Sequence, residues 1–150
     1  MTDSPETNSG SRIDPRTVRA YLETEYLVHL DPGSDLALLV GRPSAALRSV
    51  HARFGVHSSA FITACNPFSR QLSEAENFAR QTALSRELIR RGLSALPGIG
   101  QHPSNQWPGE ESFLVLGISL EAANEFAKTF EQNGFIWMDM DCTPQLILLR

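Results

Sequence analysis

Cysteines and long apolar runs are scarce in this chain, and each scarcity excludes a class of protein. Two cysteines among 150 residues, Cys65 and Cys142, cannot build a disulfide framework, and they favour a reducing compartment. No apolar run approaches the ~20 residues that a membrane-spanning helix requires. The N-terminal segment has neither a basic start nor an apolar core, so we expect no signal peptide and a cytoplasmic location.

The length and composition indicate one domain that needs no disulfide bond or metal ion to be stable. A chain of 150 residues with 41% hydrophobic and 20% charged residues is typical of a globular protein. Residues 1–12 are polar and cannot bury anything, so we expect a disordered tail there. Residues 13–150 are then a single globular domain.

Charge is distributed unevenly along the chain. The net charge is −4, yet residues 42–91 carry eight arginines against three acidic residues. This basic segment indicates either an anionic ligand or a general preference for arginine as the cation. It contains few aromatic residues, so nucleic-acid binding is not expected. We expect no membrane partner, and the oligomeric state stays open.

Capping residues and hydrophobic periodicity predict eleven elements in the order α-β-β-α-β-α-β-β-α-β-β. Asp14, Ser44, Ser73 and Ser119 are expected to cap the four helices, and Gly55 to end the second. An Asp31-Pro32-Gly33-Ser34 turn is expected between the first two strands. The helices are predicted at residues 15–24, 45–54, 72–91 and 120–132, and the strands at 25–30, 36–41, 58–64, 94–100, 112–118, 135–140 and 145–149. This order predicts an α/β fold with α+β character: a mixed β-sheet with helices packed on it.

Polar residues gather where the predicted strand 58–64 ends. Thr63 and Asn66 follow this strand, and Asn77 lies on the next helix, on a face shared with Gln81 and Leu84. Ligands of open α/β sheets bind in crevices at strand ends. The three side chains are therefore expected close together, either contacting a ligand or with Asn77 holding the backbone of the Asn66 loop.

The loop from Gly100 to Glu111 is a second candidate. Trp107 could fold over the crevice with Glu110 or Glu111 pointing into it, or it could simply cover the edge of the core. A carboxylate beside Arg80 would favour binding, whereas one with a raised pKa would favour acid chemistry. The glycines match no phosphate-binding or dinucleotide motif, so no cofactor is expected.

Thiol and metal chemistry are not favoured. Cys65 with His51 or His57 as base would be a nucleophile, but no flanking pattern of a thiol enzyme is present, and a small buried residue explains Cys65 equally well. The histidines lack metal-ligand spacing, so no metal site is expected.

Several of these motifs together resemble a bacterial family catalogued as domain of unknown function 3293. The resemblance extends over roughly residues 20–140 and is carried by Ala20-Tyr21, Phe61–Pro67, Leu72–Asn77, Gly100, Trp107 with Glu111, Phe113–Gly117, Phe130–Asn133 and Phe135–Trp137. It implies no activity. It also implies an aromatic residue where Cys65 stands, which argues further against a catalytic thiol.

Three function classes remain open. The first is a cytoplasmic ligand-binding or regulatory domain holding a small polar or anionic molecule in a crevice lined by Thr63, Asn66, Asn77 and Arg80, with Trp107 and Glu111 as a further wall. The second is a hydrolase- or transferase-type enzyme that uses Glu111 as acid/base. The third is a protein-interaction module that pairs through its terminal strand.

Overall fold

The computed structural model describes residues 12–31, 34–104 and 109–150. Four α-helices, one short 3-10 helix and seven strands follow one another in the predicted order. They are α1 (Pro15–Glu23), β1 (Glu25–Asp31), β2 (Ser34–Leu38), α2 (Ala45–Phe54), β3 (Ser59–Ile62), η1 (Pro67–Ser69), α3 (Glu74–Arg90), β4 (Ser94–Gln101), β5 (Glu110–Leu116), α4 (Leu120–Thr129), β6 (Gly134–Met138) and β7 (Gln145–Leu148). The middle of the predicted 31–34 turn, most of the predicted N-terminal tail and Trp107 lie outside the described residues.

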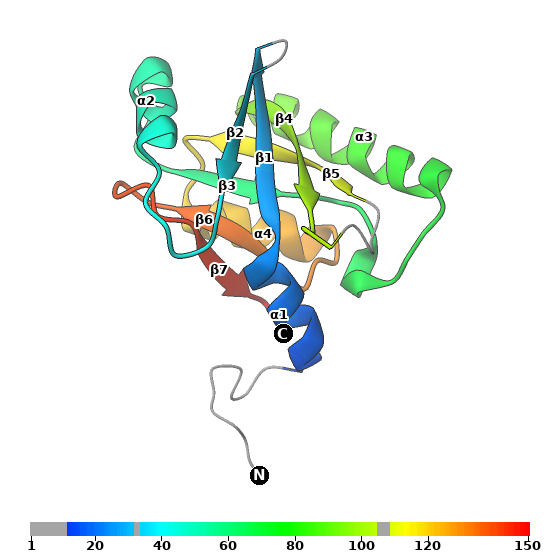
Figure 1. Cartoon of the computed structure of the whole chain (residues 1–150). Helices are drawn as coiled ribbons and strands as arrows, with labels where there is room; N and C mark the ends of the chain where they lie inside the picture. The colour runs from blue at the N-terminus through cyan, green and yellow to red at the C-terminus, as the bar shows by residue number, and fades with distance from the viewer. Residues whose placement is uncertain (1–11, 32–33, 105–108) are drawn as a thin grey trace.

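All seven strands form one curled sheet in the order β2-β1-β4-β5-β3-β6-β7 (Figure 1). Each neighbouring pair is antiparallel, whereas we had expected a mixed sheet. The physical reason lies in the helical crossovers. The connection through α3 leaves β5 between β3 and β4, and the connection through α4 leaves β3 between β5 and β6. Strands joined by a helix are therefore never adjacent, and each parallel pair is separated by an antiparallel strand.

The helices begin where their capping residues predicted. Ser44 accepts from the Leu47 amide, and Gly55 ends α2 in the left-handed conformation at φ 66°. Ser73 and Glu76 form the predicted capping box of α3, so the helix starts at Glu74 and not at Leu72.

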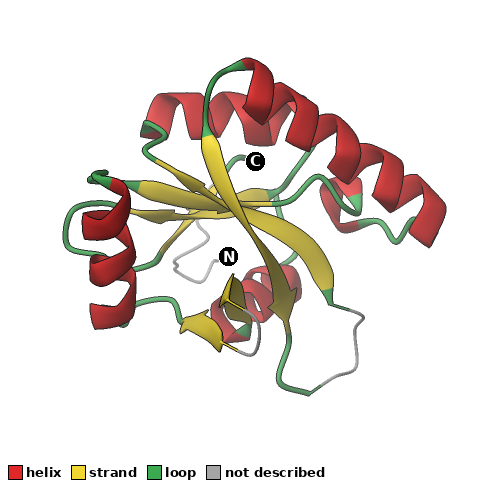
Figure 2. Ribbon diagram, turned by 90° about the horizontal axis from the view of Figure 1, so that it is seen from above, coloured by secondary structure: helices red, strands yellow, loops and turns green. Residues whose placement is uncertain are grey.

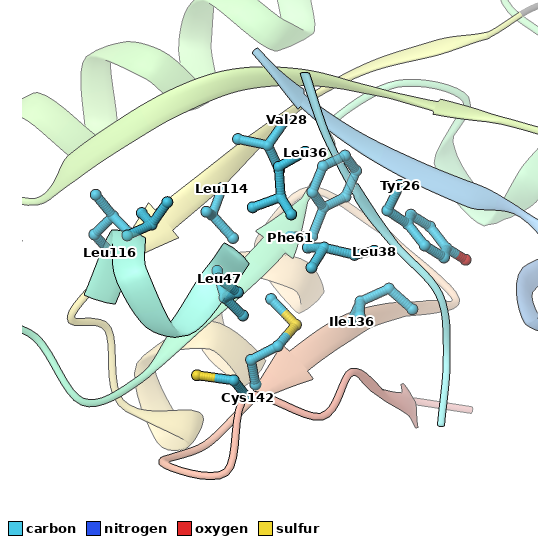
Figure 3. Close-up of a cluster of buried hydrophobic side chains, with 12 residues drawn as sticks. Tyr26, Val28, Leu36, Leu38, Leu47, Phe61, Leu114, Leu116, Ile136 and Cys142 are labelled. Atoms are coloured by element: carbon cyan, nitrogen blue, oxygen red, sulfur yellow. The ribbon is translucent and has the colours of Figure 1, made fainter. Parts of the chain in front are cut away.

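Each face of the sheet buries a separate hydrophobic cluster. α3 and α4 cover one face (Figure 2), where Leu84, Leu88 and Phe126 pack against Ile62 and Val115. On the other, concave face, Leu47 of α2 points into a group of strand side chains that includes Phe61 and Leu114 (Figure 3). α1 also lies on the concave side of the sheet (Figure 2). None of the helices in the described ranges is long and apolar enough to cross a membrane.

Candidate functional site

A cavity of about 410 Å³ lies between α1 and the concave face of the sheet. Its apolar side is formed by Tyr26, Phe61 and Ile136 from three strands. Gly100 of β4 pairs with Tyr26 on one side and with Glu110 on the other, so the missing side chain leaves space between them. The polar lining comes from Thr17 and Tyr21 of α1 and from Thr63, Ser69, Gln71, His102, Glu110 and Gln132.

The loop after β3 reaches the cavity through an unusual backbone path. Asn66, Phe68 and Ser69 have φ angles of 50°, 51° and 62°, in the left-handed region that few non-glycine residues adopt. The Phe68 amide donates to the Glu131 carbonyl at 2.7 Å, and the Arg150 guanidinium lies 4.3 Å from the centre of the Phe68 ring. These contacts hold Ser69 at the rim of the cavity.

Asn66 is the centre of a hydrogen-bond network that links this loop to α3 and β5. Its backbone N–H donates to Asn77 Oδ1 at 2.8 Å, and its Oδ1 accepts from Asn77 Nδ2 at 2.9 Å and from the Leu72 amide at 2.9 Å. Its Nδ2 donates to Glu110 Oε2 at 2.8 Å. The expected proximity of Asn66 and Asn77 is thus confirmed, and Asn77 holds the loop backbone. Asn66 fixes the orientation of the Glu110 carboxyl group.

Glu110 is the half-buried carboxyl group of the cavity. The β5 alternation places it on the same face as Ser112 and Leu114, which is the concave face. Burial raises the pKa of Glu110, and the hydrogen bond from Asn66 opposes this only in part. The protonated form of Glu110 is therefore more accessible than that of an ordinary glutamate, and its charged form lacks solvation by water.

Two tyrosines bring hydroxyl groups to the same region. Tyr21 Oη lies 3.5 Å from Ser69 Oγ, and Asn133 Nδ2 donates to the same Ser69 Oγ at 2.9 Å. Tyr26 Oη donates to the Tyr21 carbonyl at 2.6 Å, which ties the end of α1 to β1. Burial, followed by weaker effects that include the Glu110 charge, raises the pKa of both phenols, so they act as neutral hydrogen-bonding groups.

Glu111 and Arg80 are engaged elsewhere. The Glu111 side chain is exposed, and its backbone carbonyl accepts from Thr63 Oγ1 at 2.6 Å. The Arg80 Nε donates to the Ala64 carbonyl at 2.6 Å and its Nη2 to the Phe130 carbonyl at 2.5 Å, while Nη1 lies 3.4 Å from Glu131. Arg80 therefore joins the end of α4 to the loop after β3. The carboxylate that enters the cavity is Glu110.

Thr63 lines the cavity, although its hydroxyl is already bonded within the protein. Its Oγ1 accepts from the Cys65 amide at 3.0 Å in addition to its bond to Glu111. Cys65 is buried at 4% exposure, and burial raises the pKa of its thiol. His51 lies on α2, where it contacts Ser59 and Cys142. Cys65 therefore lacks the environment of an activated nucleophile.

A metal-binding cluster is likewise absent from the described ranges. Sequence reasoning missed Tyr21, Ser69 and Gln71 as lining residues. Helical periodicity over residues 15–24 predicts that Tyr21 faces the core, and no local signal predicts the backbone path that brings Ser69 to the cavity. Strand alternation extended back from Leu114 would have selected Glu110 over Glu111.

The fold and the cavity define a single α/β domain with a pocket between one helix and the concave face of an antiparallel sheet. Residues 62–134 match the family model described as Protein of unknown function (DUF3293). The resemblance found in the sequence is confirmed over that segment. It covers the Asn66 loop, α3, β4, β5 and α4, whereas α1 lies outside it. No curated protein and no solved structure matches the chain.

Proposed function

We propose that this protein binds a small polar molecule in the cavity beneath α1. This proposal is carried by a cavity of about 410 Å³ whose lining combines an oriented, half-buried carboxyl group with an apolar surface. Pockets for small molecules have this volume and this composition, with a few placed polar groups among apolar side chains. An anionic ligand is not favoured. Arg80, the cation expected to hold it, is bonded to two backbone carbonyls, and the Glu110 carboxylate would repel an anion.

A pocket-filling substitution tests this function. A Cβ built on Gly100 meets only ordinary contacts at 3.7–3.8 Å, from Thr24 and Tyr26. Because Gly100 lines the cavity, Gly100→Val is expected to fill part of it while the protein still folds. Wild-type protein is screened by thermal shift against nucleosides, sugars, amino acids, amines and their phosphates. A ligand at 100 times its dissociation constant adds about 2.7 kcal/mol to stability. Ser94→Val, an exposed position on the same strand, is the control.

The expected result is a hit that Gly100→Val abolishes and Ser94→Val retains. Retention of every hit by a folded Gly100→Val protein would place the ligand elsewhere and contradict the proposal. So would a screen in which no compound stabilises the wild type.

A second candidate function is acid/base catalysis by Glu110, in a hydrolase- or transferase-type reaction. The raised pKa of a carboxyl group inside a pocket favours it, because a general acid must hold its proton near the working pH. Turnover of chromogenic esters, glycosides or phosphates that Glu110→Gln abolishes and Glu111→Gln retains would support this function. Equal turnover by both variants would exclude Glu110 as the acid.

A protein-interaction module stays a further alternative, since β7 is the last strand at one edge of the sheet. We also propose a cytoplasmic location, because both cysteines are free thiols. Fractionation of the expressing cell tests that proposal, and recovery of the protein in an exported fraction would contradict it.

A further inference from the structure

We propose that the ligand of this cavity is an organic cation, a primary or secondary amine with an apolar body, and that Glu110 is its counter-ion. This inference rests on the proposed binding function and adds the chemical class of the ligand. It is carried by the way in which charges are distributed around the cavity.

The basic side chains that line the cavity already have acidic partners. Arg16 Nη2 lies 3.2 Å from Asp14 Oδ2 at the start of α1. His102 Nε2 lies 3.0 Å from Glu23 Oε1. By contrast, no Lys, Arg or His within residues 12–31, 34–104 and 109–150 forms an ion pair with Glu110. Its neighbours are the Asn66 amide and the two tyrosines, which are neutral.

Glu110 is half-buried. A ligand that covers this carboxylate removes its remaining water, and a cationic ligand compensates for that loss of solvation, whereas a neutral one does not. The Asn66 Nδ2 donor holds Oε2, so the carboxyl group is already oriented when the ligand arrives. An ammonium group also donates hydrogen bonds, which the hydroxyl oxygens of Tyr21 and Ser69 can accept.

The rest of the cavity suits an apolar body beside the charge. The Tyr26 and Phe61 rings meet edge to face with their centres 5.3 Å apart, and Ile136 lies on the same apolar side. Aromatic rings attract cations through their π faces in addition to burying apolar surface. Carboxylate, aromatic rings and hydroxyl groups together form the recognition chemistry of an amine.

A matched panel tests the charge of the ligand separately from its binding. Butylamine, benzylamine and tryptamine are each compared with the alcohol and the carboxylate of the same carbon skeleton, by calorimetry on wild-type protein at pH 7. We expect at least one amine to bind at least tenfold more tightly than its alcohol and its carboxylate. Glu110→Gln retains an oxygen for Asn66 and is expected to lower amine affinity at least tenfold. Glu111→Gln, with its exposed side chain, is expected to leave amine affinity unchanged.

Two outcomes would overturn the inference. One is a panel in which no amine binds, or in which every amine that binds is matched in affinity by its alcohol or its carboxylate. The other is a folded Glu110→Gln protein with unchanged amine affinity. If Glu110→Gln does not fold, the preference of wild-type protein for amines over alcohols and carboxylates still tests the inference. If neutral ligands bind the wild type and Gly100→Val abolishes their binding, the proposed binding function holds and only the inference of a cationic ligand fails.

Discussion

Replacing Asn66 by Asp exchanges one donor of the network for an acceptor and leaves its shape unchanged. The Oδ1 contacts with the Leu72 amide and Asn77 Nδ2 persist, because either carboxylate oxygen accepts hydrogen bonds. The group that faces Glu110 Oε2 over 2.8 Å becomes a second carboxylate oxygen. The substitution therefore turns one attractive contact into a repulsive one and changes little else.

The magnitude follows from this contact. A lost hydrogen bond to a charged group costs about 1.5–3 kcal/mol. The two carboxylates avoid the full repulsion by sharing a proton, which restores a hydrogen bond between them at low pH. We expect Asn66→Asp to lower the free energy of unfolding by about 3 kcal/mol at pH 8 and by on the order of 1 kcal/mol at pH 5. The loss grows with pH, since the shared proton dissociates as pH rises.

Urea unfolding of wild type, Asn66→Asp, Glu110→Gln and the double variant at both pH values measures this effect. In the double variant the amide introduced at position 110 donates its side-chain N–H to the new carboxylate, so most of the loss at pH 8 should be recovered. The interaction free energy of the cycle should be about 2 kcal/mol. Additive single effects, or an equal cost at pH 5 and pH 8, would refute the assigned contact between Asn66 and Glu110.

Further predictions concern the core and the sheet. Cys65→Ala should cost on the order of 1 kcal/mol in urea unfolding and leave ligand binding intact; loss of binding by the folded variant would contradict the packing role. Burial lowers the pKa of His51, so stability present above its ordinary pKa of 6.5 should be lost as pH falls below that value. His51→Gln, which does not titrate there, should lack this part of the acid sensitivity in melting curves from pH 7 to pH 5. Gly98→Ala should destabilise by about 1–3 kcal/mol, because its Cβ would meet the Leu27 carbonyl and lie 2.9 Å from the Phe61 ring; a melting temperature equal to that of the wild type would show that the two strands move apart freely.

Local chemistry explains why the elements could be predicted from the sequence. Helix ends depend on residues within one turn, so Ser44, Gly55 and the Ser73–Glu76 pair are visible without tertiary information. The proximity of Asn66 and Asn77 followed for a similar reason, since a short loop joins the strand end to the helix.

The strand order and the cavity could not be predicted in this way. Whether β5 inserts between β3 and β4 depends on which edges pair, and this is decided by packing across the whole sheet. Which of Glu110 and Glu111 points into the cavity depends on the alternation of side chains along β5. This strand starts at Glu110, two residues before the predicted start at Ser112. Continued over those two residues, the alternation points Glu110 to the concave face.

The backbone conformation of the 66–69 loop supports a role for this region in addition to stabilising the fold. Left-handed conformations at non-glycine residues cost of order 1–3 kcal/mol each where they are strained, and Phe68 and Ser69 are less suited to them than Asn66. Glycine at either position would remove that cost. The side chains that replace it have distinct uses: the Phe68 ring stacks beneath Arg150, and Ser69 Oγ reaches the cavity beside Tyr21. Strain of this kind persists where surrounding contacts hold it. Because Asn66 contacts Glu110 and Ser69 contacts Tyr21, both of which line the cavity, the strained loop supports the proposal of a binding site there.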